Sequence, residues 1–485
     1  MLNLVHNLQK TWLSNLRLDI LAGITVALAL LPEAIAFSII AGVDPMVGLY
    51  AAFCIAVTIA FVGGRPGMIS GATGAMALLM ITLVAEHGLE YLLAATILTG
   101  FIQLGAGFLK LGRFISFIPH SVMIGFVNAL AILIFLAQLP YFLGHGLLVY
   151  GLVAFTLVII YGLPRLTKSI PSALVAIIVV TAICIAMGFG VQTVGDMGTI
   201  TRELPFFALP SIELSFQTLM IILPYSLTLA LVGMLESLLT ASIVDEMTQT
   251  KSDKDKELRG QGIANAITGC FGGMAGCAMI GQSVINVKCG GRGRLSSLVA
   301  GAFLMFLILV LGDVVTKIPM AALVGVMIMV AIGTFDWKSV LELHRVPIAD
   351  SLVMISTVAV VVYTHDLAKG VAVGVILSAV IFGWRIANIT IAEEIQLDGV
   401  KHYRVGGQLF FASTDRFIDA FSVQEDPEEV VIDFSASHVW DHSAVIAIAR
   451  TLINSPMWRW FFFMSALHRP AAVNSFRPGW TSSSS

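Results

Sequence analysis

Long apolar runs, separated by short polar loops, constrain this chain more than any other feature of its sequence. A helix that spans the hydrocarbon core of a bilayer needs about 20 mostly apolar residues, and such runs recur from residue 18 to residue 392. Only 12% of the 485 residues are charged, whereas soluble domains usually carry about 25%. So few charges cannot cover a protein of this size in water, and the sequence therefore predicts an all-α polytopic membrane protein.

The sequence predicts 14 transmembrane segments. Twelve are uninterrupted apolar runs, and two come from residues 261–287, where glycines divide the run (GCFGGMAGCAMIGQ). The uninterrupted runs span residues 18–43, 46–62, 68–85, 91–112, 114–140, 146–163, 171–190, 216–244, 295–312, 318–335, 350–364 and 367–392. Residues 1–17 are then a cytoplasmic N-terminal segment, and residues 18–392 form the transmembrane domain.

Lys and Arg are divided unevenly between the loops on the two sides of the predicted segments. One side holds Lys10, Arg17, Arg65, Lys110, Arg113, Arg165, Lys168, Lys251, Lys254, Lys256, Arg259, Lys288, Arg292, Arg294, Lys338 and Arg345. The other side holds little beyond Arg202, Lys317 and Lys369. Because short loops rich in Lys and Arg stay in the cytoplasm, we expect both termini to be cytoplasmic, in a plasma (bacterial inner) membrane.

Two parts of the chain resemble each other at a distance. LALLPEAIAFSIIAG (28–42) and LVGMLESLLTASIVD (231–245) each carry a glutamate in the corresponding place. Further along, GGRPG (63–67) matches GGMAG (272–276), with glycines at the same three positions. These matches predict an internal repeat, and a chance similarity between glycine-rich apolar segments is the alternative.

The predicted repeats cover about residues 18–190 and about residues 216–392. If each repeat has seven segments, an odd number, the second enters the membrane from the opposite side. That arrangement is the inverted repeat of many secondary transporters, whose binding site lies near the midplane where broken segments of both halves meet.

A short stretch with polar residues follows each glycine break, at residues 69–74 (ISGATG) and 278–283 (AMIGQS). Irregular backbone survives at membrane depth only where it lines a cavity or is packed inside protein. Helices that begin here would point free N–H groups and the positive ends of their dipoles at such a cavity. Two facing N-termini could hold an oxyanion without Lys or Arg, and tight helix packing through small residues is the alternative.

Glu236 is the only charged residue between residues 216 and 243. An ionisable side chain in mid-membrane is costly and marks a functional site by default, so we expect Glu236 to carry a proton alongside an anion. Thr240 lies one helical turn later on the same face. Glu33 follows a proline that should bend or break its helix, and it is the weaker candidate because it could face a water-filled vestibule. A neutral Glu236 satisfied by a neighbouring helix is the alternative.

Composition changes past the last apolar run. Residues 400–412 (VKHYRVGGQLFFA) and 428–434 (EEVVIDF) have the pattern of β-strands, and residues 441–452 (DHSAVIAIARTL) that of an amphipathic helix. These elements predict a small α/β domain that is only partial, at residues 393–454. Residues 455–485 form an atypical tail without further strand–helix alternation, and we favour a truncated or frame-altered end as its explanation.

The sequence offers no metal, cofactor or catalytic signature. The five cysteines (Cys54, Cys184, Cys270, Cys277 and Cys289) form no C-x-x-C pair and no cluster with His at metal-ligand spacing. We therefore expect buried thiols that act as small hydrophobes, no metal and no cofactor. No basic patch indicates nucleic acid as a partner, and no catalytic motif indicates an enzyme.

Several motifs, in this order, resemble the SulP family, the sulfate permease family of anion transporters, over almost all of residues 15–450. They are LLPEAIAFSIIAGVDPMVGLYAA, GGRPGMISGATGAMALLM, LESLLTASIVDEMT, GQGIANAITGCFGGMAGCAMIGQS and INVKCGGRGRLS. The resemblance implies a seven-plus-seven inverted repeat divided into core and gate domains, a homodimer, and an anion held between the N-terminal ends of the third and tenth segments. The partial α/β domain resembles the start of the family's STAS domain.

The resemblance also implies site residues. The substrate-binding positions are Ser70, Gly71, Ala72, Thr73, Ala278, Met279, Ile280, Gly281 and Gln282, and the proton-coupling positions are Glu236 and Thr240. Glu33, argued above from its place in the first segment, is the weaker proton-coupling candidate. Sodium-coupled bicarbonate members have a hydroxyl residue where this chain has Met279 and Ile280, which makes sodium doubtful and favours a cotransported proton. Many animal and plant members have an arginine where this chain has Gln282, so helix dipoles and the cotransported cation must do more.

These observations predict secondary active transport of a small anion (sulfate, bicarbonate or a small dicarboxylate) by proton-coupled symport with alternating access. An anion exchanger and a sodium-coupled bicarbonate-type symporter are the alternatives within transport. A membrane-anchored sensor or scaffold that acts through the STAS domain is the alternative from a different class. The expected partners are the anion, the lipid bilayer and a second copy of the chain.

Overall fold

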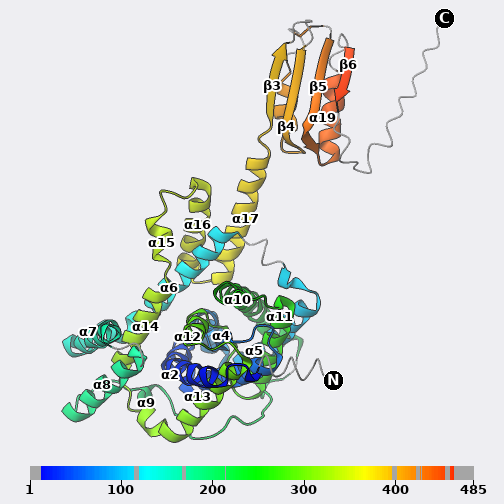
Figure 1. The fold of residues 1–485 in the computed structure, drawn as a ribbon. Helices are drawn as coiled ribbons and strands as arrows, with labels where there is room; N and C mark the ends of the chain where they lie inside the picture. The colour runs from blue at the N-terminus through cyan, green and yellow to red at the C-terminus, as the bar shows by residue number, and fades with distance from the viewer. Residues whose placement is uncertain are drawn as a thin grey trace, which may run out of the picture. The chain divides into compact units, whose positions relative to one another are not determined.

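The computed structural model describes residues 12–113, 119–166, 171–213, 215–395, 401–421, 426–427, 429–453 and 459–463 (Figure 1). The chain forms two compact units, Met1–Val375 and Ile376–Ser485. The described part of the first unit is helical apart from two very short strands, whereas the second contains a four-stranded sheet. The boundary between the units falls inside helix α17 (Leu367–Ile386).

Within the residues that the structure describes, each predicted segment corresponds to a separate helix. In chain order these helices are α2 (Leu16–Ala41), α3 (Pro45–Val62), α4 (Gly74–His87), α5 (Leu89–Phe108), α6 (His120–Phe142), α7 (Gly146–Gly162), α8 (Ser172–Met187), α10 (Phe216–Thr248), α11 (Lys254–Cys270), α12 (Ile280–Lys288), α13 (Arg294–Val315), α14 (Met320–Thr334), α16 (Ile348–Thr364) and α17. The short helices η3 (Leu163–Arg165), α9 (Val194–Met197) and α15 (Trp337–Leu341) lie in the connections.

The hydropathy of these helices confirms the predicted helical membrane protein. Among the described residues, 8 helices are long and apolar enough to cross a membrane, and α4, α8, α14 and α16 are shorter apolar helices. The glycine-rich run at residues 261–287 is divided, as predicted, between α11 and the nine-residue α12. The number of membrane crossings stays a prediction.

The helices of the first unit pack in two groups. The core group consists of α2 to α5 and α10 to α13, and the gate group consists of α6 to α8, α14 and α16. Within the core group, α4 and α12 lie between α2 and α10, which contact both of them (Figure 1). The two short helices that follow the glycine breaks are therefore enclosed by longer ones.

Helices α5 and α11 approach each other through facing glycines. A Cβ added to Gly100 would lie 2.6 Å from the carbonyl oxygen of Gly262, and one added to Gly262 would lie 2.5 Å from the backbone nitrogen of Leu104. Small residues allow helix backbones to come this close inside a membrane. Close packing through small residues, the alternative considered for the glycine breaks, thus operates in this unit between α5 and α11.

Of the bend or break expected at the proline of the first segment, a break does not occur. Helix α2 runs from Leu16 to Ala41 with Pro32 inside it. A proline is tolerated inside a membrane helix where neighbouring helices and local adjustments satisfy the freed backbone groups, and α2 is packed against α3, α4, α12 and α13. Glu33 is only 8% exposed, so the expectation that it faces a water-filled vestibule is wrong for this structure.

The second unit is a mixed sheet with helices. Its strand order is β3 (Thr390–Ile395), β4 (Lys401–Leu409), β5 (Glu429–Val439) and β6 (Arg459–Phe463). The pair β3–β4 is antiparallel, whereas β4–β5 and β5–β6 are parallel. Helices α18 (Thr414–Asp419) and α19 (His442–Ile453) complete the unit. Its buried core comprises Tyr403, Val405, Leu409, Phe417, Phe421, Val430, Ile432, Phe434, Ala444 and Ala447.

A buried lysine is held by its partners at the edge of this core. Lys401 Nζ lies 2.6 Å from Asp426 Oδ1 and 3.0 Å from Glu393 Oε2. Burial by itself would lower the pKa of Lys401, but hydrogen bonds with Asp426, Tyr403 and Glu393 raise it above its usual value. The ion pairs therefore keep this lysine charged.

Strands of the second unit extend past both ends of the predicted partial α/β domain, residues 393–454. The last apolar helix ends at Ile386, and the strand that begins at Thr390 crosses the expected boundary between residues 392 and 393. The predicted atypical tail contains β6, because its aromatic run RWFFF favours a pleated strand and pairs in parallel with β5. The rest of the tail, residues 464–485, lies outside the described residues.

Candidate functional site

The two glycine breaks meet as a pair of short strands. β1 (Ser70–Gly71) pairs antiparallel with β2 (Cys277–Ala278). The backbone N–H of Met279 also donates to the carbonyl oxygen of Ile69 at 2.9 Å. The sequence predicted that the breaks face each other, but not that they hydrogen-bond. Their antiparallel direction is the one that an inverted repeat requires.

A helix begins immediately after each strand. α4 starts at Gly74, and its N-cap Thr73 accepts a hydrogen bond from the backbone N–H of Met76 at 3.4 Å. α12 starts at Ile280, and its N-cap Met279 supplies no side-chain hydrogen bond. The first N–H groups of a helix have no partner within it, so the two helix ends present donors and positive dipole ends from opposite repeats. Such ends are suited to an anion.

Open space adjoins the first turn of α12. A Cβ added to Gly281 would have no atom within 4 Å, and Gly281 is exposed whereas Ile280 is partly exposed. The other predicted substrate-binding residues are buried: Ser70, Gly71, Ala72, Thr73, Ala278, Met279 and Gln282. The end of α12, rather than the strands, is therefore the accessible part of the predicted site.

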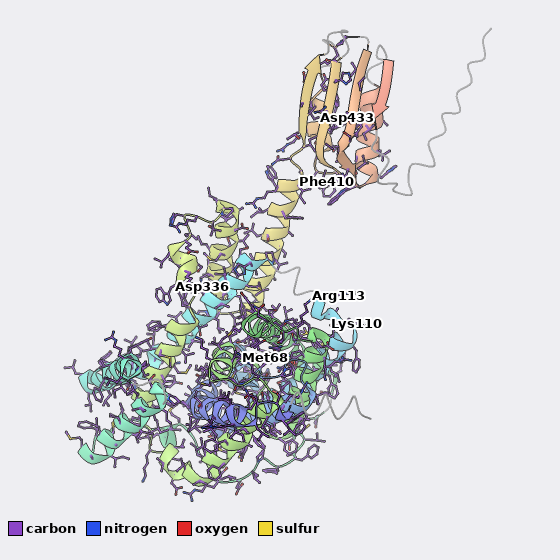
Figure 2. All side chains as sticks on the ribbon, in the orientation of Figure 1. Met68, Lys110, Arg113, Asp336, Phe410 and Asp433 are labelled. Atoms are coloured by element: carbon purple, nitrogen blue, oxygen red, sulfur yellow. The ribbon has the colours of Figure 1, made fainter. Side chains whose placement is uncertain are left out.

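The buried members of the predicted site hold the strand pair in place. Ser70 Oγ accepts a hydrogen bond from Gln261 Nε2 of α11 at 2.8 Å. Ala278 packs with Met68 and Ala241, and Figure 2 labels Met68 among the helices of the first unit. A direct contact of these residues with substrate stays a prediction.

Glu236 is connected to the end of α4 through a cysteine. Glu236 Oε2 accepts a hydrogen bond from Cys277 Sγ at 2.9 Å, and Cys277 Sγ lies 3.2 Å from Thr73 Oγ1. Thr240 donates to the backbone carbonyl of Glu236 at 2.7 Å, so its hydroxyl is engaged with the helix rather than with the carboxyl group. Cys277, expected to be a simple apolar residue, is thus part of a polar chain.

The second predicted carboxylate is connected to α12. The side-chain nitrogen of Gln282 donates to Glu33 Oε2, which joins the first turn of α12 to α2. Both side chains are buried, with 4% and 8% of their surfaces exposed. The glutamine that stands where a positive charge was considered is therefore turned toward a carboxylate.

Several residues of the site were not predicted from the sequence. Ser237 Oγ accepts from the backbone N–H of Ala278 at 3.1 Å. Asn265 accepts from the N–H of Gly276 at 2.9 Å and donates to its carbonyl oxygen at 3.0 Å, as a neighbouring strand would. Polar residues at helical spacing within an apolar run, such as Gln261 and Asn265, were the signal that could have found them.

We expect Gly276→Ala to destabilise the strand pair, because the new Cβ would lie 2.1 Å from the carbonyl oxygen of Gly71. Backbone cannot move away as a flexible side chain does, and overpacking typically costs about 1–3 kcal/mol. Thermal unfolding in detergent, followed by size-exclusion chromatography, measures the loss. Gly105→Ala in α5 is the matched control, since nothing lies within 4 Å of its Cβ; equal stability of the two variants would contradict the prediction.

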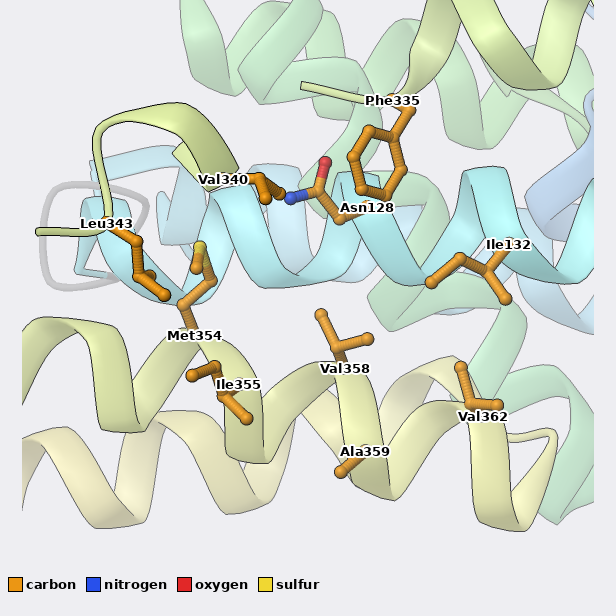
Figure 3. A pocket seen from close by; sticks show the side chains of 10 residues that line it. All are labelled: Asn128, Ile132, Phe335, Val340, Leu343, Met354, Ile355, Val358, Ala359 and Val362. Atoms are coloured by element: carbon orange, nitrogen blue, oxygen red, sulfur yellow. The ribbon is translucent and has the colours of Figure 1, made fainter. Parts of the chain in front are cut away.

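An apolar cavity lined by residues of α6, α15 and α16 is a poor site for an anion. A space of about 450 Å³ is lined by Asn128, Ile132, Phe335, Val340, Leu343, Met354, Ile355, Val358, Ala359 and Val362 (Figure 3). Asn128 is the one polar side chain in that lining, and its amide is already bonded to Ser339 Oγ at 2.9 Å and to the N–H of Asp336 at 2.7 Å. The lining offers an oxyanion one remaining side-chain donor, the second N–H of the Asn128 amide.

The comparison with known proteins decides the family. Residues 16–149 and 146–357 match the Sulfate permease family, and residues 392–454 match the STAS domain. The chain belongs to the sulfate permease family. It is accordingly an integral membrane protein whose second unit contains a STAS domain, as predicted.

Relatives of this sulfate permease family member include named transporters. It is 62% identical over 447 residues to "Putative sulfate transporter YbaR" of Bacillus subtilis (strain 168). That alignment covers 92% of this chain and 94% of that protein. It is 30% identical over 420 residues to "Bicarbonate transporter BicA" of Picosynechococcus sp.. That alignment covers 80% of this chain and 73% of that protein. These relatives are transporters and not enzymes.

Solved structures share the fold. The transmembrane domain of a cyanobacterial bicarbonate transporter, BicA, aligns with a TM-score of 0.67 and 29% identity, covering 76% of this chain and 98% of that one. Murine Slc26a9, an anion transporter solved in the inward-facing state, aligns with a TM-score of 0.81 over 94% of this chain and 86% of that one. Its 18% identity makes it a comparison of fold alone.

Proposed function

We propose that this sulfate permease family member is a secondary active transporter that moves a small anion together with a proton. The observation that carries the proposal is the β1–β2 pair, which brings the N-terminal ends of α4 and α12 together. Backbone N–H groups and helix dipoles then attract an anion without any fixed positive side chain. Sulfate, bicarbonate and small dicarboxylates all present oxygens that such donors can bind.

The substrate-binding residues of the proposal are those around the two helix ends. Gly281 and Ile280 adjoin the open space, and the backbone from Ser70 to Thr73 and from Ala278 to Met279 shapes the donors behind it. Gln282 extends this group toward Glu33. Anion selectivity then depends on the size of the space and on the number of N–H donors that reach it.

Glu236 is the proposed proton carrier. It is 5% exposed and is hydrogen-bonded to Cys277 of β2, which places its carboxyl group beside the strand that leads into α12. Buried ionisable groups of this kind are typical of proton relays in transporters. Glu33, bonded to the first turn of α12, is the second candidate, and Thr240 supports the helix backbone at Glu236.

The chemistry of the α12 end favours a proton over sodium. Sodium prefers oxygen ligands, whereas the residues at the start of α12 are Met279, Ile280 and Gly281, which bring no side-chain oxygen. Sodium-coupled symport and anion exchange remain the competing functions within transport.

The proposal includes a bacterial plasma membrane location, cytoplasmic termini and a homodimer. Alternating access would come from movement of the core group against the gate group, which carries the helix ends between the two sides. A sensor or scaffold that acts through the STAS domain is the candidate from a different class, and it requires no accumulation of anion by the purified protein.

Transport by purified full-length protein in liposomes tests the function. We expect labelled sulfate, bicarbonate or a dicarboxylate such as succinate to accumulate when the outside is more acidic, and not when only a sodium gradient is imposed. Uptake that needs a counter-anion inside and ignores pH would indicate an exchanger. No uptake of any of these anions would overturn transport in favour of the scaffold.

A further inference from the structure

A cysteine stands between the proposed proton carrier and the proposed anion site. Cys277 Sγ is 2.9 Å from Glu236 Oε2 of α10 and 3.2 Å from Thr73 Oγ1 at the start of α4. The Cys277 side chain is 0% exposed. The chain Glu236–Cys277–Thr73 therefore runs through the protein interior from a carboxyl group to the end of a helix.

The direction of this chain is determined when Glu236 is ionised. A carboxylate only accepts, so the single S–H proton of Cys277 is donated to Glu236. Thr73 Oγ1 already accepts from the backbone N–H of Met76 at 3.4 Å. The hydroxyl proton of Thr73 is then donated toward the Cys277 sulfur and the Glu236 carboxyl group, since Thr73 is also a side-chain hydrogen-bond partner of Glu236.

Protonation of Glu236 changes the donors along the chain. A protonated carboxyl group has a proton to donate, and Cys277 is the neighbour bonded to its Oε2. When Glu236 donates to the sulfur, the S–H group is free to turn to Thr73 Oγ1, and either atom of that contact can be the donor. The hydroxyl proton of Thr73 is released to point away from Cys277, at the N-terminus of α4.

We propose that Cys277 is a positioning residue that couples the protonation of Glu236 to anion affinity, by freeing the Thr73 hydroxyl to donate to the anion. The proposal rests on the proposed proton-coupled transport and gives it a physical route. An additional donor at the helix end strengthens anion binding, and linkage requires that the anion then favours the protonated form of Glu236 by the same factor. No large movement is needed, only the reorientation of two protons.

Other titratable groups on the elements packed against α10 have partners of their own or lie near helix ends. Glu257 of α11 accepts from the backbone N–H groups of Gly64 and Arg65 and from Gln261, Lys254 pairs with Asp245 at 3.2 Å, and Glu33 accepts from Gln282. The remaining groups on those elements are Glu86, His87, Glu90, Tyr91, Asp255, Lys256, Arg259, Cys270 and Lys288, and Arg65, in the connection before α4, pairs with Asp245 of α10 at 3.3 Å. Of the titratable side chains described, Cys277 is the one hydrogen-bonded to the carboxyl group of Glu236.

Binding of labelled sulfate, with labelled bicarbonate in parallel, tests the coupling in full-length protein reconstituted in nanodiscs. We expect wild-type affinity to rise about tenfold as the pH falls through the titration of Glu236, within the usual range of coupling between two sites. Cys277→Ser keeps one donor and one acceptor and should retain most of this pH dependence. Cys277→Ala breaks the chain and should reduce the change to less than about twofold, with binding itself preserved.

The control is Cys184→Ala, which removes a buried thiol from α8 and should leave the pH dependence as in the wild type. Full pH dependence in Cys277→Ala would overturn the role of Cys277 while leaving proton coupling intact. A wild type without pH dependence would instead overturn the proposed proton coupling itself, so the two failures are distinguishable.

Infrared difference spectroscopy provides a second measurement that does not depend on the alanine variant folding. The S–H band assigned to Cys277, by its loss in Cys277→Ser, should move to higher frequency as the pH falls, because the thiol exchanges a carboxylate acceptor for a hydroxyl. The shift should be absent in Glu236→Gln. A band that does not move with pH in the wild type would overturn the proposal.

Discussion

Glu236→Gln is expected to abolish uptake driven by a pH gradient while leaving the protein folded. A gradient of one pH unit is worth about 1.4 kcal/mol per proton, which supports about tenfold accumulation of an anion at one proton per anion. Glutamine keeps the shape of the side chain, and its amide oxygen can still accept the hydrogen bond from Cys277 Sγ. It cannot take up a proton in this range, so accumulation should fall to the level of simple equilibration.

Labelled-anion uptake in proteoliposomes, with and without an imposed pH gradient, measures this loss. Glu86→Gln is the matched control, because Glu86 is an exposed carboxylate near the other end of α4 and should behave as the wild type. The same measurement on Glu33→Gln shows which of the two candidate carboxylates, Glu33 or Glu236, contributes more to pH-driven uptake. Unchanged pH-driven accumulation in Glu236→Gln would remove Glu236 from the coupling mechanism.

Gly281→Trp is expected to lower anion affinity by about 100-fold or more, which corresponds to about 2.7 kcal/mol. The added Cβ meets nothing within 4 Å, so the indole enters the open space at the first turn of α12 without disturbing the packed strands. It would occupy the volume and shield the N–H donors that the anion requires. Folding should therefore be retained while binding is lost.

Sulfate and bicarbonate binding to the purified variant, together with its thermal unfolding, checks both parts of this expectation. Gly151→Trp in α7 is a matched control, since Gly151 is also an exposed helical glycine with nothing within 4 Å of its Cβ. Wild-type affinity in Gly281→Trp would refute binding between the two helix ends.

The structure also shows why other bulky substitutions are less informative. Ala278 is 0% exposed and packs with Met68 and Ala241, and a Cβ on Gly71 would lie 3.4 Å from the sulfur of Met279. Bulk at either position would push the strand pair apart before it reached an anion. Loss of binding there could reflect loss of the fold.

The fold was largely predictable because each of its elements has a recognisable local pattern in the sequence. Long apolar runs indicate the helices, glycines indicate the breaks that precede α4 and α12, and a change to an alternating pattern indicates the strands of the second unit. Errors arose where packing overrides a local preference. Pro32 continues a helix that its neighbours support, and β6 forms because another strand stands beside it.

The site was predictable to the level of segments but not of contacts. Glu236 stood out because a charge in an apolar run is costly. The partners of the site were missed because hydrogen bonds between Cys277 and Glu236, or between Asn265 and Gly276, join residues that do not lie on the same helix. Such pairs depend on how helices from the two repeats are placed in space.

The apolar runs thus determined by themselves that this chain is a polytopic membrane protein with two glycine breaks and a lone mid-membrane glutamate. Only the tertiary structure decided that the interruptions pair as β1 and β2, that Gly281 is the accessible position, and that Cys277 joins Glu236 to Thr73. The physical reason is that the preference of a segment for lipid or for water depends on its own residues. It can therefore be predicted segment by segment from the sequence. Hydrogen bonds at membrane depth are made between segments more than 200 residues apart, such as Thr73 and Cys277, and they exist only once those segments are packed together.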